Sequence, residues 1–213
     1  LVSYINQFSG KVAIFVKPCD AKALVGLLQE HQIEREKLHI IGINCQGALN
    51  PKKLRNAIKG RMVKDWSING DKIKVYYESG EEEFNIKDFL LDKCPACDTR
   101  TPPIYDELLG DEIKTADLPE LLARVKELEK LPAAEKQQYW NEHFERCLRC
   151  YACVKICPLC YCERCFVENA SPQWIDKSNN LKSNKAFHLI RAYHLAGRCI
   201  DCGECDRACP MDI

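Results

Sequence analysis

The stretch RCLRCYACVKICPLCYCERC, residues 146–165, decides how this chain folds, because seven of its twenty residues are cysteine. Its first four cysteines follow the spacing C-x2-C-x2-C-x3-C-P from Cys147 to Pro158. The same spacing recurs from Cys199 to Pro210. This is the bacterial pattern for a 4Fe-4S cluster. Each iron needs one thiolate, and three closely spaced cysteines can wrap three corners of the cluster from one tight loop.

The fourth cysteine of each run precedes proline and lies on the departing chain, so it reaches the other cluster. The sequence therefore assigns one cluster to Cys147, Cys150, Cys153 and Cys209. The other is assigned to Cys199, Cys202, Cys205 and Cys157. Zinc is the alternative, because CxxC pairs also form zinc sites. Two full copies of the motif with a trailing proline favour clusters.

Length and composition narrow the class of protein. The 213 residues suggest one large domain or two small ones. Lys+Arg and Asp+Glu are both 31, which gives no sign of a nucleic-acid partner. No apolar run approaches the roughly 18 residues of a membrane span, and no signal peptide is visible. The chain begins at Leu1 and ends at Ile213 directly after a motif, so we expect a longer natural protein.

The fifteen cysteines are too many and too closely spaced for an ordinary soluble chain. Their odd number and metal-like spacing argue against a disulfide scaffold. We therefore expect thiolates held by metal, in a reducing and anaerobic cytoplasm.

Helices are predicted around both cysteine runs. Residues 118–131 are amphipathic with Asp117 as a cap, Pro132 opens a second helix, and residues 183–196 form a third with Gly197 as a C-cap. Clusters set between helices resemble the alpha-helical ferredoxin domain of fumarate reductase iron–sulfur subunits and heterodisulfide reductase small subunits. The resemblance covers roughly residues 117–213 and implies a dicluster domain at 116–213.

The first half of the chain reads as strand and helix in alternation. Residues 12–16 and 38–45 are short apolar runs typical of buried strands. Asp20 is expected to cap a helix after the first strand, and Asn50-Pro51 opens another that runs to Ile58. This order favours parallel strands. Asn69-Gly70 predicts a hairpin between residues 62–66 and 72–77. The predicted fold is an α/β domain at 1–115 with a small parallel or mixed sheet, joined to a mainly α-helical dicluster domain.

Four further cysteines lie in this first domain. Cys19 and Cys45 follow the two predicted parallel strands, so they should share one edge of the sheet. Cys94 and Cys97 form a CxxC pair. Four thiols on one site predict a third 4Fe-4S cluster. Zinc, or a redox pair with two buried cysteines, are the alternatives.

The segments KPCDAKALVGLL, IIGINCQG and CPACD resemble the C-terminal domain of the beta subunits of coenzyme F420-reducing hydrogenases and dehydrogenases. That family consists of iron–sulfur flavoproteins that pass electrons between clusters, FAD and a deazaflavin. The resemblance implies that Cys19, Cys45, Cys94 and Cys97 are cluster ligands. Lys17 stands where the family commonly has Thr, so FAD binding and deazaflavin reduction are not carried over with these motifs.

Three cysteines of the opening stretch are left unassigned: Cys160, Cys162 and Cys165. They could form a fourth metal centre with a ligand from elsewhere, line a cluster as buried thiols, or act in thiol exchange or redox sensing.

The sequence predicts an electron-transfer subunit of an oxidoreductase complex. About three clusters would relay electrons between a flavoprotein, hydrogenase, formate dehydrogenase or heterodisulfide-reductase-like partner and another redox subunit. No residue is proposed as a catalytic acid or base. The alternatives are an FAD-containing catalytic subunit that acts on a soluble cofactor such as a deazaflavin, and a zinc-binding interaction module.

Overall fold

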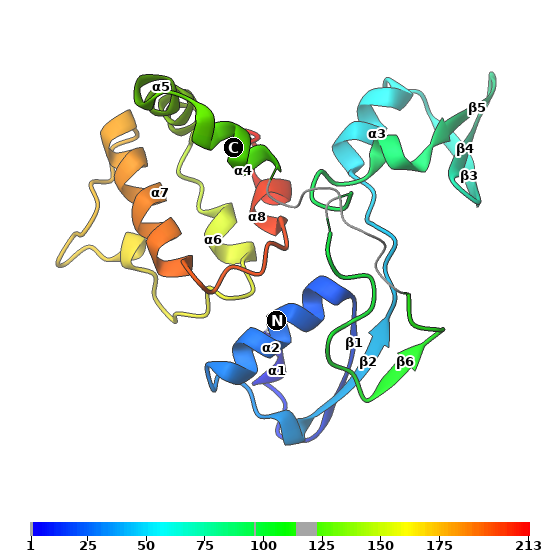
Figure 1. Ribbon diagram of the computed structural model, residues 1–213, viewed down its shortest axis with the longest axis horizontal. Helices are drawn as coiled ribbons and strands as arrows, with labels where there is room; N and C mark the ends of the chain where they lie inside the picture. Colours follow the sequence, from blue (N-terminus) through cyan, green and yellow to red (C-terminus); the bar gives the residue numbers. More distant parts are fainter. Residues whose placement is uncertain (1, 96, 114–122) are drawn as a thin grey trace. The chain divides into compact units, whose positions relative to one another are not determined.

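A computed structural model describes residues 2–95, 97–113 and 123–213 of the chain (Figure 1). These residues form two compact units. The first contains residues 2–44, 101–113 and 123–213, and the second contains residues 45–100. The predicted domain boundary at 115/116 falls outside the described residues, so it stays a prediction.

The first unit contains a small parallel sheet with the strand order β1-β2-β6. Its strands are β1 (Val12–Val16), β2 (Leu38–Ile43) and β6 (Glu107–Leu109). A short helix α1 (Val2–Ile5) precedes β1, and helix α2 (Pro18–Gln29) lies between β1 and β2 in the chain. The predicted strand at 12–16 is confirmed, and the second strand ends two residues earlier than predicted. The α/β class with a small parallel sheet is therefore confirmed.

Helix α2 begins earlier than the sequence analysis expected. Pro18 occupies its first turn and Lys17 is the N-cap, so Asp20 is not the capping residue. The fixed φ of proline suits the first turn of a helix and moves the start toward Pro18. The Asp20 carboxylate instead reaches back and accepts a hydrogen bond from the Lys17 backbone N–H at 3.2 Å. Asp20 therefore stabilises the same helix end from inside the first turn.

The core of the first unit joins α2 to the cysteine-rich segment. Leu24 and Leu27 of α2 are fully buried and pack with Ile40 of β2. Leu159, from the first cysteine run, belongs to the same core and is 3% exposed. A Cβ at Gly26 would lie 3.2 Å from Leu159 Cδ2, so the glycine permits this close approach. The run after Cys157 is thus fixed against α2.

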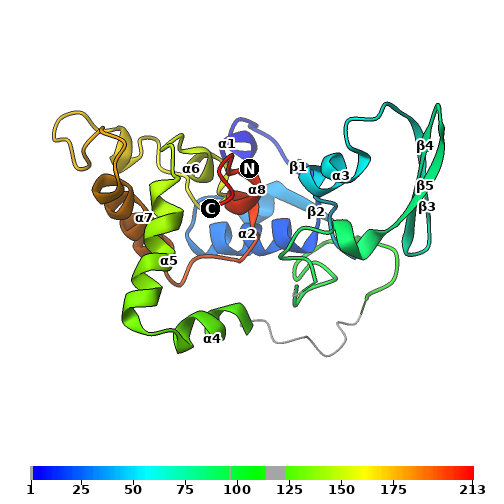
Figure 2. The ribbon, with the colours of Figure 1, turned by 90° about the horizontal axis from the view of Figure 1, so that it is seen from above.

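The described residues of the first unit contain five further α-helices after β6 (Figures 1 and 2). The longer ones are α4 (Ala123–Lys130), α5 (Ala133–Glu145) and α7 (Leu181–Leu195), and α5 and α7 lie side by side. The short α6 (Ala152–Ile156) and α8 (Glu204–Ala208) lie against each other. The helices predicted after Pro132 and at 183–196 are confirmed. The predicted cap Asp117 lies outside the described residues.

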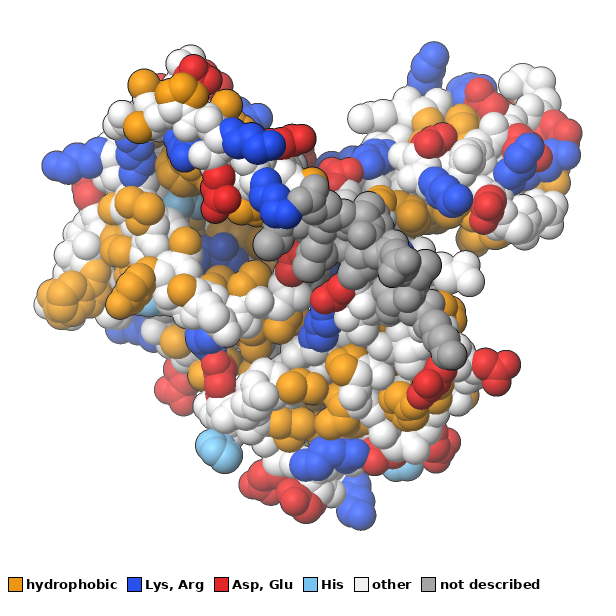
Figure 3. Space-filling model, viewed as in Figure 1, with side chains coloured by type: hydrophobic (Ala, Val, Ile, Leu, Met, Phe, Trp, Pro, Cys, Tyr) orange, Lys and Arg blue, Asp and Glu red, His pale blue; other side chains and the backbone are white. Residues whose placement is uncertain are grey.

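The second unit holds a three-stranded antiparallel sheet and one helix. Its elements are α3 (Pro51–Ile58), β3 (Val63–Asn69), β4 (Lys72–Tyr77), β5 (Gly80–Asn85) and the 3-10 turn η2 (Ile86–Phe89). Asn50 caps α3 by accepting from the Lys52 N–H at 2.9 Å. The predicted helix and hairpin are confirmed. Figure 3 shows basic and acidic side chains interspersed over this unit. One ion pair on the sheet joins Lys74 and Glu81 at 2.6 Å.

In the ranges that the structure describes, no helix is both long and apolar enough to cross a membrane.

An ion pair links α2 to the segment after α7. Arg198 donates to both carboxylate oxygens of Glu30, with Nη2 at 2.6 Å from Oε2. Arg198 Nη2 also donates to the Leu159 carbonyl at 3.2 Å. The hydrogen bonds from Arg198 lower the pKa of Glu30 from its ordinary value of 4.5. This bidentate pair thus supports the contact between the α/β layer and the cysteine-rich segment.

Replacing Glu30 with Gln should lower the free energy of unfolding by about 1 kcal/mol near neutral pH, the upper end for exposed pairs. Because the folded-state pKa of Glu30 is lowered, its contribution is present above 4.5 and is lost as the pH falls through the lowered pKa. Chemical denaturation of both proteins over this pH range measures the difference. The exposed pair Glu34–Lys37 supplies the control, Glu34→Gln. A difference that does not shrink at acidic pH would contradict the prediction.

Candidate metal centres

The two cysteine runs adopt the same backbone conformation. In the first loop Arg149 and Tyr151 have φ values of 52° and 60°, and in the second Asp201 and Gly203 have 53° and 62°. Each loop then enters a five-residue helix, α6 or α8. Left-handed φ is uncommon for residues other than glycine. Its recurrence at matching positions shows that the two runs are structural copies of one motif.

Cysteines from both runs line a small cavity beside α6, α7 and α8. They are Cys147, Cys150, Cys153, Cys205 and Cys209, around a volume of about 100 Å³. Burial raises the pKa of the Cys147 thiol, and its neighbours Cys209 and Cys150 raise it further. The last cysteine of the second run therefore lies beside the first run. This cavity contains all four residues that the sequence assigns to the first cluster.

Three residues that line this first cavity each have a buried nitrogen atom without a hydrogen-bond partner among the described residues. They are Arg149 Nε, His188 Nε2 and Arg191 Nε. An unsatisfied buried polar group costs about 1–3 kcal/mol. A cluster in the cavity would offer sulfur acceptors to donors placed in this way. The residues around the first cavity thus fit a 4Fe-4S cluster both by their thiols and by their unpartnered nitrogens.

Burial also controls the protonation of the groups in the first cavity. It raises the pKa of the Cys153 thiol, although the charge of Arg191 acts in the opposite direction. Burial and Arg191 lower the pKa of His188 to about 4, so its ring is neutral near pH 7. Thiols must lose their protons to ligate iron, so cluster binding at this site releases protons.

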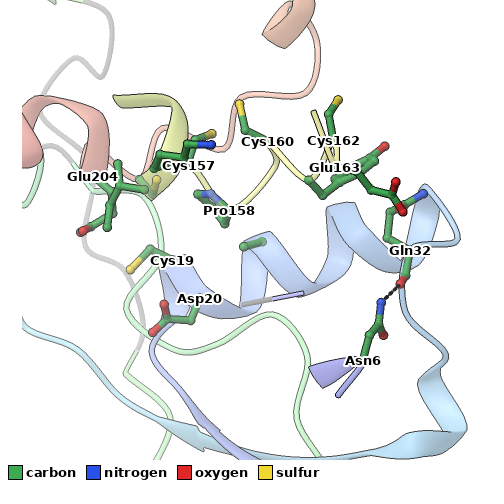
Figure 4. Close-up of a pocket in the computed structure, with 15 residues that line it drawn as sticks. Asn6, Cys19, Asp20, Gln32, Cys157, Pro158, Cys160, Cys162, Glu163 and Glu204 are labelled. Carbon is green, nitrogen blue, oxygen red and sulfur yellow. Dashed lines mark hydrogen bonds between the residues drawn. The ribbon is translucent and has the colours of Figure 1, made fainter. Parts of the chain in front are cut away.

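The second predicted ligand set is distributed over three cavities. Cys157 and Cys202 line a cavity of about 690 Å³ (Figure 4), Cys199 lines another, and Cys205 lines the first cavity. A hydrogen bond from the Cys160 thiol lowers the pKa of Cys157 to about 6. The ligation of one cluster by these four thiols stays a prediction.

The larger cavity holds a combination that the sequence analysis missed. Cys19, in the first turn of α2, lines it together with Cys160 and Cys162. In Figure 4, however, the side chains of Cys160 and Cys162 point away from Cys19. No sequence signal could have paired Cys19 with this run, because the contact depends on how α2 packs against Leu159.

Of the third predicted ligand set, three cysteines lie in the second unit. Cys94 is buried and accepts a hydrogen bond from the Ala48 N–H at 3.3 Å. Cys97 donates to the Thr99 carbonyl at 3.2 Å, and the Cys45 N–H donates to the Arg100 carbonyl at 2.9 Å. Cys19 lies in the first unit. The four-thiol site therefore also stays a prediction.

The structure also shows how the cysteine side chains are paired and grouped. All fifteen cysteines are within the described ranges, and none forms a disulfide. Across those ranges, no group of three or more histidine, cysteine, aspartate or glutamate side chains has the geometry of a metal site. The first cavity is lined by the thiols that the sequence assigns to the first cluster, and their ligation of iron stays a prediction.

Comparison with known proteins finds a matching family model for each half of the chain. The family model for the C terminus of the coenzyme F420 hydrogenase/dehydrogenase beta subunit matches residues 9–156. The chain belongs to this family. A 4Fe-4S dicluster domain matches residues 142–213 and includes both cysteine runs. The resemblances found in the sequence, to the F420 beta-subunit family and to dicluster ferredoxin domains, are confirmed.

Two curated proteins and one solved structure are similar to this chain. The chain is 28% identical to F420-dependent formate dehydrogenase subunit beta of Methanocaldococcus jannaschii, over 95% of this chain and 68% of that protein. It is 27% identical to F420-dependent formate dehydrogenase 1 subunit beta of Methanococcus maripaludis, over 87% and 63%. The chain thus spans about two thirds of these relatives. The F420-reducing [NiFe] hydrogenase complex from Methanosarcina barkeri matches with a TM-score of 0.32 and 21% identity, over 45% and 40% of the two chains, which is too distant to support an argument.

Asn184 of α7 fixes the entrance of the first cysteine loop. It is 1% exposed, and its Nδ2 donates to the carbonyls of Phe144 at 2.9 Å and Cys147 at 3.0 Å. Both carbonyls lie where α5 ends and the first loop begins. This one amide therefore sets the position of Cys147 relative to α7.

Replacing Asn184 with Ala should lower the free energy of unfolding by about 2 kcal/mol, because the buried carbonyl of Cys147 loses its side-chain donor and the carbonyl of Phe144 loses one of its donors. Lys182→Ala is the matched control, since Lys182 is exposed on the same helix and should change the stability by less than about 0.5 kcal/mol. Denaturation of the iron-loaded proteins under anaerobic conditions measures both. Equal stabilities of the two variants would contradict the role given to Asn184.

Proposed function

We propose that this chain is an iron–sulfur electron-transfer subunit of an oxidoreductase complex. The observation that carries the proposal is the first cavity, in which thiols from both cysteine runs lie beside three unpartnered buried nitrogens. Membership of the F420 beta-subunit family and the match to a dicluster domain support the same class of function. No catalytic acid or base is needed, because electron transfer between clusters moves no atoms.

A bound 4Fe-4S cluster supplies the capacity to take up and release one electron at a time. The residues of this chain bind, bury and tune that group. Cys147, Cys150, Cys153 and Cys209 would hold the first cluster. The α7 helix closes the cavity on one side with His188 and Arg191. Burial of this kind excludes water, which strengthens the effect of every nearby charge.

The proposal includes about three clusters. The second would be held by Cys199, Cys202, Cys205 and Cys157, and the third by Cys19, Cys45, Cys94 and Cys97. The thiols of the second set line three different cavities, so the loops that carry them would have to move when iron binds. Metal binding commonly completes the folding of such sites. Residues 116–213 would then form a mainly α-helical ferredoxin-type domain.

The partners proposed are a formate dehydrogenase, hydrogenase or other flavoprotein subunit and a second redox subunit. The support is that the relatives with 28% and 27% identity are named as beta subunits of F420-dependent formate dehydrogenases. FAD binding and reduction of a deazaflavin would extend the proposed electron-transfer function to a catalytic one. We place the complex in a reducing cytoplasm, where thiolate ligands persist.

Iron, acid-labile sulfide, zinc and flavin content of the anaerobically purified chain test the proposal. We expect about 12 irons per chain, from three four-iron clusters. Cys209→Ser should remove about four of these irons, because it takes one ligand from the first cavity. Cys162→Ser is the matched control and should leave the iron content unchanged, since Cys162 belongs to none of the three sets.

The competing functions give different results in the same measurement. Stoichiometric flavin in the isolated chain would extend the function to a catalytic subunit. About 16 irons, with a loss on Cys162→Ser, would mean that the spare cysteines build a fourth cluster. Zinc without iron would overturn the electron-transfer function and favour an interaction module.

A further inference from the structure

Arg191 places a positive charge between thiols of both cysteine runs. It lies on α7, and its Nη2 donates to the Cys153 carbonyl at 2.9 Å. Cys153, Cys205, Cys157 and Cys160 all interact electrostatically with it. All four thiols of the first ligand set line the first cavity together with Arg191, whereas of the second set only Cys205 does. Arg191 is therefore part of the wall of the first site.

The Arg191 guanidinium is only partly satisfied by the protein. Its Nε is buried and has no hydrogen-bond partner in the described residues. The charged groups that act on it most strongly to raise its pKa are cysteines. A buried cation is unfavourable unless an anion compensates it. An anionic cluster in the first cavity is such a compensating group.

The two loops differ in charge at equivalent positions. Arg149 of the first loop is 8% exposed and corresponds to Asp201 of the second, which is exposed. Arg149 lines the first cavity, and its backbone N–H donates to Cys147 Sγ at 3.4 Å. Its Nη atoms donate to the carbonyls of Asp176 and Ser178, and its Nε is buried without a partner among the described residues. His188 adds a third unpartnered nitrogen to the same wall. The positive charges and the unpartnered nitrogens thus gather around the first cavity.

Reduction adds a negative charge to a cluster that is already anionic. A nearby cation stabilises the reduced form more than the oxidised form, and the effect is large where water is excluded. Hydrogen bonds to the cluster sulfurs act in the same direction. We propose that Arg191 raises the reduction potential of the cluster held by Cys147, Cys150, Cys153 and Cys209 above that of the second cluster. A single electron shared by the two clusters would then reside mainly on the first cluster at equilibrium.

This inference rests on the proposed function, because it requires a cluster in the first cavity. Arg191 acts on that cluster through charge and hydrogen bonding and is a tuning residue, not a catalytic one. Its effect is therefore read from a reduction potential and needs neither a partner subunit nor turnover.

The test is an EPR-monitored titration of the anaerobically reconstituted full chain with dithionite as the reductant. Cys150→Ser identifies the first cluster, because only that signal should shift or disappear. Arg191→Gln should make its reduction at least tenfold less favourable, which is about 59 mV for a one-electron couple. Lys182→Gln removes an exposed positive charge from the same helix and should change the equilibrium by less than about threefold.

The outcomes separate the two proposals. A chain without iron would overturn the proposed function and this inference with it. Full iron content, with a first-cluster potential that moves no more in Arg191→Gln than in Lys182→Gln, would overturn this inference alone. If the Arg191→Gln variant does not retain iron, the two cluster potentials of the unmodified chain test the inference. The first cluster must then have the higher of the two dicluster potentials, and the reverse order would overturn the inference.

Discussion

The packing of Leu159 against α2 is the contact on which the first unit depends. Leu159 lies between Cys157 and Cys160, so a single apolar side chain fixes the cysteine-rich run in the core of the α/β layer. The absence of a side chain at Gly26 makes room for it, and the Arg198–Glu30 pair supports the same contact. Any displacement of Leu159 would move thiols on both sides of it.

This anchoring explains why cysteines distant in sequence come to line common cavities. Cys19 enters the larger cavity because α2 carries it there, and Cys209 reaches the first cavity because α8 lies against α6. The protein interior is closely packed, so these placements are linked to one another. The apolar core brings the thiols together, and the binding of iron would complete their geometry.

The two cysteine loops are copies in backbone and unequal in surroundings. Their φ values agree at matching positions, but a buried arginine in one corresponds to an exposed aspartate in the other. Helix α7 adds Arg191 and His188 to the first cavity. A motif used twice can in this way give two sites of different potential, because burial and nearby charge tune a cluster whose ligands stay the same.

The sequence by itself determined the local elements and the chemistry. Spacing identified the two cluster motifs, apolar runs predicted β1 and β2, and Asn69-Gly70 predicted the hairpin, because each signal depends on neighbours in the chain. It misjudged the start of α2, where Pro18 outweighs Asp20. Only the tertiary structure decided that Cys19 shares a cavity with Cys160 and that Arg191 lines the cavity of the first ligand set. Those placements depend on packing between residues far apart in the chain, which no local pattern records.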